Sequence, residues 1–260
     1  MLGYHGIADV RFEHDPHNLM IPPAAFRAQV EWLQERSYEF VTVSEFVRRL
    51  VAGESLSGCC ALTFDDGSED AASTLRALLE ELGVVGTIYV CPGLLGRPHP
   101  FLRAGSGVRI LTREELVELS RPPVFEIGAH TNLHTDLANA TAEEAYRELA
   151  SSKEALEDLI GRPVETFAYP FCRYSPACPA AAERAGYSSA VTCEGRGGLV
   201  PFELKREAVS RLDGRLALAL RRRGVYDSVF GSAPGRLVRV ATRPVRTATR
   251  AARTRRDGTS

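Results

Sequence analysis

Three short polar segments of the sequence carry side chains that could together perform metal-assisted hydrolysis. Each follows an apolar run: Asp65-Asp66-Gly67, the pair His130 and His134, and Tyr169-Pro170-Phe171. Two adjacent carboxylates at the end of a buried strand are costly unless positive charge lies beside them, and a divalent metal is the simplest source. Because neighbouring residues of a strand point to opposite sides, one Asp can bind the metal while the other stays free as a base.

The two histidines supply imidazole ligands at the spacing i, i+4. On one turn of a helix, His130 and His134 would present both rings to one point. Two His and one carboxylate form a facial triad with open coordination positions, where a metal lowers the pKa of a bound water toward ~7 and polarises a carbonyl. Either motif alone is more often a turn or surface feature, but the two together at successive predicted strand ends indicate a site.

The elements around these segments must bring successive strand ends together. Apolar, strand-like runs alternate with segments of helical periodicity about seven times. This pattern predicts an α/β fold, a parallel (β/α)7-type barrel that is distorted or incomplete, with its chemistry at the ends of the strands. We predict strands at 40–43, 59–64, 86–91, 124–128, 165–169 and 189–192, and helices that begin at 22 and 44 or span 72–82, 112–119, 141–160 and 177–185, with Ser44 as a helix cap.

Charge and composition divide the chain into a folded body and a basic tail. We expect a single catalytic domain over residues 1–212, an amphipathic helical extension over 213–241 and a disordered low-complexity tail over 242–260. From Arg215 onward there are 12 Arg against 2 Asp, a net charge of +10, which leaves 20 basic and 31 acidic residues upstream, a net charge of −11. An acidic body argues against nucleic-acid binding, whereas the tail would suit weak contact with an anionic membrane or an acidic partner.

Cysteine usage and hydropathy predict where the protein resides. None of the six cysteines forms a C-x-x-C pair, and we expect free thiols in a reducing compartment, with a Cys172–Cys178 disulfide as the alternative. The first residues lack the pattern of a signal peptide, and no apolar run approaches ~18 residues. These features predict a cytoplasmic protein, membrane-peripheral if the tail binds lipid.

In order, Thr63-Phe64-Asp65-Asp66-Gly67, His130-Thr131-x-x-His134 and Phe167-Ala168-Tyr169-Pro170-Phe171 resemble the three successive motifs of the polysaccharide deacetylases. This family is carbohydrate esterase family four, with the nodulation-factor deacetylase homology domain, and the resemblance covers residues 1–212. It implies that Asp66, His130 and His134 hold a divalent metal, zinc first and cobalt, nickel or manganese as alternatives. Asp65 would be the general base, and Tyr169, Pro170 and Phe171 would contact the substrate and its oxyanion.

The family usually has a histidine general acid downstream of the third motif, but no histidine follows His134. Tyr4-His5-Gly6-Ile7 resembles instead the Y-H-x-I element of the circularly permuted branch that acts on poly-β-1,6-N-acetylglucosamine. This resemblance implies that His5 is the general acid, and the alternative is a structural histidine near the N-terminus.

Two departures from the family pattern bear on activity. Many members have an Arg that braces the base Asp where this chain has Ala168, and Cys172 replaces the usual Gly after the third motif. Three further histidines in expected loops, His14, His17 and His99, are interpreted as surface residues.

The resemblance implies hydrolytic removal of an N-acetyl group from an N-acetylated amino sugar or glycan, with a small or lipid-linked glycan as the substrate. The alternatives are hydrolysis of a non-sugar amide or cyclic ureide on the same fold, and a catalytically weak glycan-binding or scaffold protein.

Overall fold

The computed structural model describes residues 1–121, 124–193 and 199–213. The predicted helical extension over 213–241 and the predicted tail over 242–260 therefore lie outside the described residues, apart from Asp213. Among the described residues, no helix has the length and apolar character needed to cross a membrane.

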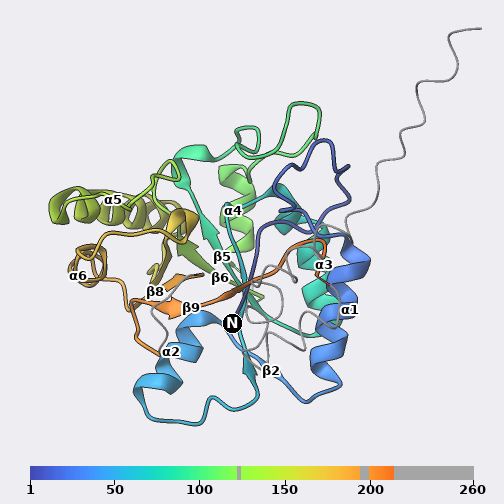
Figure 1. The fold of residues 1–260 in the computed structure, drawn as a ribbon, viewed down its shortest axis with the longest axis horizontal. Coiled ribbons are helices and arrows are strands. Elements are labelled where there is room, and N and C mark those ends of the chain that lie inside the picture. Colours follow the sequence, from blue (N-terminus) through green and yellow to red (C-terminus); the bar gives the residue numbers. More distant parts are fainter. Residues whose placement is uncertain (122–123, 194–198, 214–260) are drawn as a thin grey trace, which may run out of the picture. The chain divides into compact units, whose positions relative to one another are not determined.

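Eight short strands, all paired in parallel, surround the centre of the domain in the order β10-β1-β4-β5-β6-β7-β8-β9 (Figure 1). Strands β9 and β10 lie on either side of Arg206, and they pair with β8 and β1 respectively. The sheet thus closes through this one segment, which confirms the predicted parallel barrel. The strands span Leu2–Tyr4 (β1), Leu62–Phe64 (β4), Gly86–Val90 (β5), Phe125–Ala129 (β6), Thr166–Ala168 (β7), Ser189–Thr192 (β8), Leu204–Lys205 (β9) and Glu207–Ala208 (β10).

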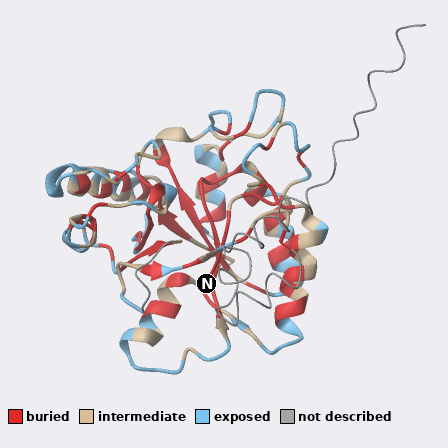
Figure 2. Cartoon of the chain, in the orientation of Figure 1, coloured by how far each residue is buried: buried red, intermediate tan, exposed pale blue. Residues whose placement is uncertain are grey.

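Helices cover the outside of the barrel, with their apolar faces toward the strands and polar faces toward solvent (Figure 2). Capping boxes at Thr112 and Thr141 begin two of them, because each Thr side chain accepts the N–H of a Glu three residues on. The α-helices span Pro23–Gln34 (α1), Val43–Val51 (α2), Thr74–Leu82 (α3), Arg113–Leu119 (α4), Ala142–Ile160 (α5) and Cys178–Arg184 (α6). Single turns of 3-10 helix span Glu69–Ala72 (η1), Pro92–Leu94 (η2) and Pro170–Cys172 (η3).

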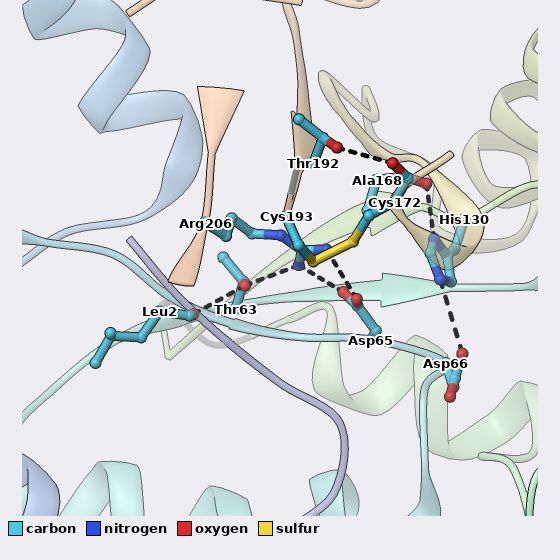
Figure 3. The surroundings of a disulfide bond; sticks show 10 residues. All are labelled: Leu2, Thr63, Asp65, Asp66, His130, Ala168, Cys172, Thr192, Cys193 and Arg206. Carbon is cyan, nitrogen blue, oxygen red and sulfur yellow. Dashed lines mark hydrogen bonds and ion pairs between the residues drawn. A yellow bond between two sulfur atoms is a disulfide. The ribbon is translucent and has the colours of Figure 1, made fainter. Parts of the chain in front are cut away.

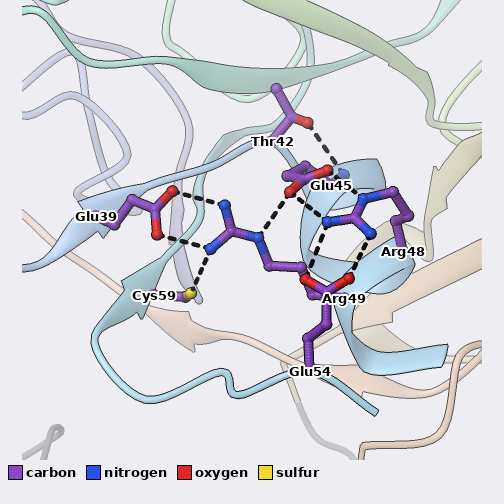
Figure 4. Close-up of polar contacts among 7 residues, drawn as sticks. All are labelled: Glu39, Thr42, Glu45, Arg48, Arg49, Glu54 and Cys59. Atoms are coloured by element: carbon purple, nitrogen blue, oxygen red, sulfur yellow. Dashed lines mark hydrogen bonds and ion pairs between the residues drawn. The ribbon is translucent and has the colours of Figure 1, made fainter. Parts of the chain in front are cut away.

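The segment before Asp65 and Asp66 differs from its prediction. The apolar run 59–64 is not one strand, because Cys59–Cys60 (β3) pairs with Glu39–Phe40 (β2) outside the barrel and only Leu62–Phe64 enters it. The cap of α2 is Thr42, which accepts the N–H of Glu45, whereas the predicted cap Ser44 donates to Glu126. An exposed ion-pair network joins α2 to this small sheet (Figure 4); such surface pairs contribute little stability.

The barrel interior is filled, so chemistry is confined to the ends of the strands. Val43 and Val47 of α2 pack with buried residues of the strands, among them Tyr89, Ala168 and Val191. Strand β5 is buried along its whole length, as expected for a parallel sheet covered by helices.

Candidate active site

The two carboxylates that follow β4 point in different directions (Figure 3). Asp65 points to Arg206, and Asp66 points toward the side chains of His130 and His134. Asp66 takes a left-handed backbone conformation with φ of 71°, which ends the strand and turns its side chain away from that of Asp65. The structure therefore separates the two carboxylates as the sequence predicted.

Arg206 holds Asp65 through two hydrogen bonds. Its Nη1 and Nη2 donate to the two carboxylate oxygens at 2.6 and 2.8 Å, and Nη1 also donates to Thr63 at 2.9 Å. Burial of Asp65 opposes its ionisation, but the charges of Arg206 and His130 and the hydrogen bonds from Arg206 outweigh it. The pKa of Asp65 therefore lies well below its usual range, and the carboxylate stays ionised.

Arg206 is a functional residue that the sequence reasoning missed. The family arginine expected beside the base is absent, and Ala168 at that position packs in the barrel core. Arg206 makes the equivalent contact from the segment that closes the barrel. Arg206 is buried between exposed Lys205 and half-buried Glu207, and no periodic pattern of apolar residues in this short segment marks its inward position.

Asp66, His130 and His134 form a cluster whose geometry fits a small divalent metal. One side-chain ligand atom from each lies within 4.8 Å of the other two. Oδ1 of Asp66 is 3.4 Å from Nε2 of His134 and 3.7 Å from Nε2 of His130. Ligand atoms ~2.1 Å from a tetrahedral zinc ion lie roughly 3.4 Å apart, so the three residues need little movement to bind one.

The histidine pair is not on a helix, which contradicts the predicted helical turn. Residues 130–134 form an irregular loop after β6, in which Thr131 and His134 both have φ of 59°. The Thr131 hydroxyl accepts the N–H of Thr135 at 2.8 Å and closes the loop. This left-handed loop, rather than a helix, brings the two ring centroids to 4.7 Å.

Each imidazole of the cluster is held in the neutral form that binds metals. Nδ1 of His130 lies 2.7 Å from the Ala168 carbonyl oxygen and must donate to it, which leaves Nε2 free to face Asp66. Burial lowers the pKa of His130 to about 4 and that of His134 to about 3. Without a cation beside it, Asp66 has a pKa raised to about 8 by burial and by the charge of Asp65. Its Oδ2 is a buried atom with no hydrogen-bond partner in the described structure.

His5 lies beside this cluster because of the strand register. Tyr4 pairs with Phe64 in the sheet and its carbonyl accepts the N–H of Asp65 at 3.0 Å, so His5 follows at the level of the carboxylates. The buried carboxylate of Asp70 accepts the N–H of Ile7 at 2.7 Å and holds the loop. Burial lowers the pKa of His5, and the charge of Asp65 opposes that shift.

The third motif contributes an aromatic rim rather than a polar wall. Phe171 is half-exposed, and its ring centroid is 4.4 Å from His134 and 5.9 Å from Phe101. Tyr169 is fully buried, stacks on Tyr174 and donates its hydroxyl to the Phe202 carbonyl, so its side chain lies away from the cluster. Pro170 is buried within η3.

His99 is not a surface residue, which corrects the interpretation from the sequence. It is 3% exposed, and its Nε2 lies 3.6 Å from Oδ2 of Asp66. Burial lowers its pKa to about 4, with the charge of His5 in support. A loop between η2 and α4 folds back over the site and carries it there, whereas His17 is exposed as expected and His14 is partly buried.

The cysteine expectations are also corrected. Cys172 forms a disulfide with Cys193 at the end of β8, close to Arg206 and Asp65 (Figure 3). Cys178, the predicted alternative partner, is a buried free thiol, as are Cys60 and Cys91. Cys172 takes a left-handed backbone conformation, with φ of 57°, at the position where the family usually has Gly.

Comparison with known proteins places this geometry in a family. Residues 52–190 match the family model described as polysaccharide deacetylase. YxkH of Bacillus subtilis, a protein assigned to the polysaccharide deacetylases, is 28% identical over 195 residues; the match covers 75% of this chain and 64% of that protein. This chain therefore spans less than two thirds of the length of that relative.

Solved structures of other proteins share the fold. The Streptococcus pyogenes deacetylase PplD, solved in complex with acetate, superposes with a TM-score of 0.71 and 25% identity, over 84% of this chain and 95% of that one. IcaB from Ammonifex degensii superposes with a TM-score of 0.69 and 22% identity, over 80% of this chain and 90% of that one. At this identity, the likeness to IcaB concerns the fold alone.

Proposed function

Because the chain belongs to the polysaccharide deacetylase family, we propose that it is a metal-dependent hydrolase that removes N-acetyl groups from an N-acetylated amino sugar or glycan. The observation that carries the proposal is the arrangement of Asp66, His130 and His134 beside an ionised Asp65. Three ligands leave coordination positions open for a substrate, as catalytic sites require and structural sites do not.

Asp66, His130 and His134 would hold the metal, with zinc as the first candidate and cobalt, nickel or manganese as alternatives. When bound, the ion would supply positive charge that polarises the amide carbonyl of the substrate. Asp65 would accept a proton from the attacking water, and Arg206 keeps this carboxylate ionised and oriented for that step. The backbone around Phe171 would donate to the developing oxyanion.

Cleavage of the amide bond releases acetate and leaves an amine that must gain a proton. His5 is the residue we assign to this step, because the register of β1 against β4 carries it to the level of Asp65. The position of His5 directly after the first strand supports the resemblance to the permuted branch that acts on poly-β-1,6-N-acetylglucosamine.

The aromatic rim supports a sugar as the substrate. Phe101 and Phe171 surround His134, and Leu133 beside it is 57% exposed. Apolar side chains of this kind can cover the C–H face of a pyranose ring while the polar cluster binds its acetamido group. We propose a small or lipid-linked glycan as the substrate.

The location of the protein is also a proposal. A cytoplasmic protein could approach an anionic membrane through the Arg-rich residues 242–260, near the site where lipid-linked glycans are assembled. The cytoplasmic location was expected partly because all six cysteines were predicted to be free thiols. The Cys172–Cys193 disulfide contradicts that prediction, so cysteine usage no longer supports this location. Salt-sensitive sedimentation with anionic vesicles, compared with a chain lacking 243–260, would test it.

The experiment that tests the function measures acetate and free amine across short N-acetylated glycosides, with zinc, cobalt, nickel or manganese added. Asp65→Asn should keep the metal and lose turnover, whereas Asp158→Asn, which alters an exposed carboxylate of α5, should match wild type. Full activity of Asp65→Asn, or no acetate release with any metal, would refute the proposal.

A further inference from the structure

Two buried polar atoms beside the metal-binding cluster lie close to each other without a hydrogen bond. Nε2 of His99 and Oδ2 of Asp66 are 3.6 Å apart, and neither has a hydrogen-bond partner in the described structure. Leaving such groups unpaired costs ~1–3 kcal/mol each, so a role for the arrangement is expected.

The proton of the His99 ring is fixed by its other nitrogen. Nδ1 accepts the backbone N–H of Phe101 at 3.3 Å, so in the neutral ring the proton is on Nε2. That proton points toward Oδ2 of Asp66, while Oδ1 faces His130 and His134. The two oxygens of Asp66 thus face different residues.

The loop that carries His99 is held as a hairpin. The N–H of His99 donates to the Val108 carbonyl at 3.1 Å, and that of Ile110 donates to the Arg97 carbonyl at 2.8 Å. Two residues after His99, the ring of Phe101 contacts His134 with centroids 4.7 Å apart. One short segment therefore contacts two of the three proposed ligands.

We propose that His99 is a positioning residue for the metal ligand Asp66. In the metal-loaded site, Nε2–H of His99 would move within hydrogen-bond distance of Oδ2, now 3.6 Å away, and would leave Oδ1 directed at the ion. This role rests on the proposed function. His99 is not itself a ligand, because it does not belong to the described set of ligand atoms within 4.8 Å of one another. Loss of a partner of this kind weakens metal affinity by ~10–100-fold.

The test compares zinc affinity, measured by chelator competition, between the wild-type protein and three variants. His99→Phe keeps a planar ring without a donor, His99→Gln restores an N–H donor, and His17→Phe removes an exposed loop histidine as the matched control. We expect ~10–100-fold weaker binding for His99→Phe, and binding close to that of wild type for the other two. Thermal unfolding of the metal-free proteins reports folding, and His99→Leu replaces His99→Phe should the latter fail to fold.

Cobalt substitution separates positioning from direct ligation. The visible spectrum of the cobalt-loaded His99→Phe protein should keep the wild-type coordination pattern. Loss of a nitrogen ligand from that spectrum, equal weakening by Phe and Gln, or unchanged affinity in a folded donor-free variant would each overturn the proposal. A wild-type protein that binds no zinc or cobalt would refute the metal site itself, whereas the other outcomes leave the proposed function intact.

Discussion

Arg206 is the residue whose replacement should show most directly how the site depends on the fold. Its guanidinium is fully buried and bonds both oxygens of Asp65 at 2.6 and 2.8 Å. In Arg206→Met, the apolar stem is kept and the charge is lost, so Asp65 is left as a buried carboxylate without its partner. Removing one partner of a buried pair costs ~3–5 kcal/mol, and for a domain of this size that lowers Tm by roughly 6–20 °C.

The pH dependence of this loss has a definite sign. Because the pKa of folded Asp65 is lowered, the pair stabilises the protein above the ordinary Asp pKa of ~3.9, and this contribution is lost as the pH falls below it. The difference in unfolding free energy between wild type and Arg206→Met should therefore be largest near neutrality and shrink below pH ~4. In the variant, burial is no longer offset, so the Asp65 pKa rises and the acid limb of the kcat/KM profile moves to higher pH.

Urea and thermal unfolding of the metal-free proteins measure the first effect, and a double-variant cycle isolates the pair. The double variant Asp65→Asn, Arg206→Met should lose less stability than the sum of the two single variants. Each single variant leaves one buried charge without its partner, whereas the double variant leaves none. Arg49→Met, which breaks an exposed bidentate pair with Glu39, should keep a midpoint close to wild type. The reasoning would be refuted if the stability losses of the two single variants added up to that of the double variant. It would also be refuted if the unfolding midpoint of Arg206→Met lay as close to wild type as that of Arg49→Met.

Three further predictions concern the remaining site residues. His5→Ala should lower kcat by ~10²–10⁴ with metal content unchanged; a value within a few-fold of wild type would return His5 to a structural role. Phe171→Ala should raise KM for N-acetylated glycosides more than it lowers kcat, whereas Phe12→Ala, at another half-exposed ring, should do neither; equal effects would argue against the rim. Because Asp66 without a cation has a pKa of about 8, zinc binding at pH 7 should release the Asp66 proton, and zinc affinity should rise as the pH rises to about 8. Calorimetry in buffers of different ionisation enthalpy would detect the released proton. A zinc affinity that does not change with pH would contradict this prediction.

The part of the site that could be predicted from the sequence is the part that follows the barrel strands. The proposed metal ligands all follow apolar runs that were predicted as strands: Asp66, His130 and His134. In a parallel barrel, the carboxyl ends of the strands meet at one end, so the predicted alternation of strands and helices brings these residues together. The conformation of the loop between the two histidines could not be predicted. Its left-handed position is occupied by Thr131, whereas the usual sequence signal for that backbone conformation is a glycine.

The missed residues act at long range and lie in segments without periodicity. Arg206 is 141 positions from Asp65 and sits between two strands of two residues each, too short for a period to be read. His99 approaches Asp66 only because its loop folds back on itself, and loop sequence carries little information about such a path. Cysteine spacing likewise does not define pairing, which is why Cys193 was not identified as the partner of Cys172.

The segment that closes the sheet, residues 204–208, is synthesised after all the other strands of the barrel. A nascent chain presents Asp65, Asp66, His130 and His134 to the folding domain before residues 204–208 leave the ribosome. Until then β8 and β1 have open edges, which invite aggregation, and Asp65 lacks its counter-charge. We therefore expect a chain that stops short of this segment to be prone to aggregation and to leave Asp65, the proposed base, without its counter-charge.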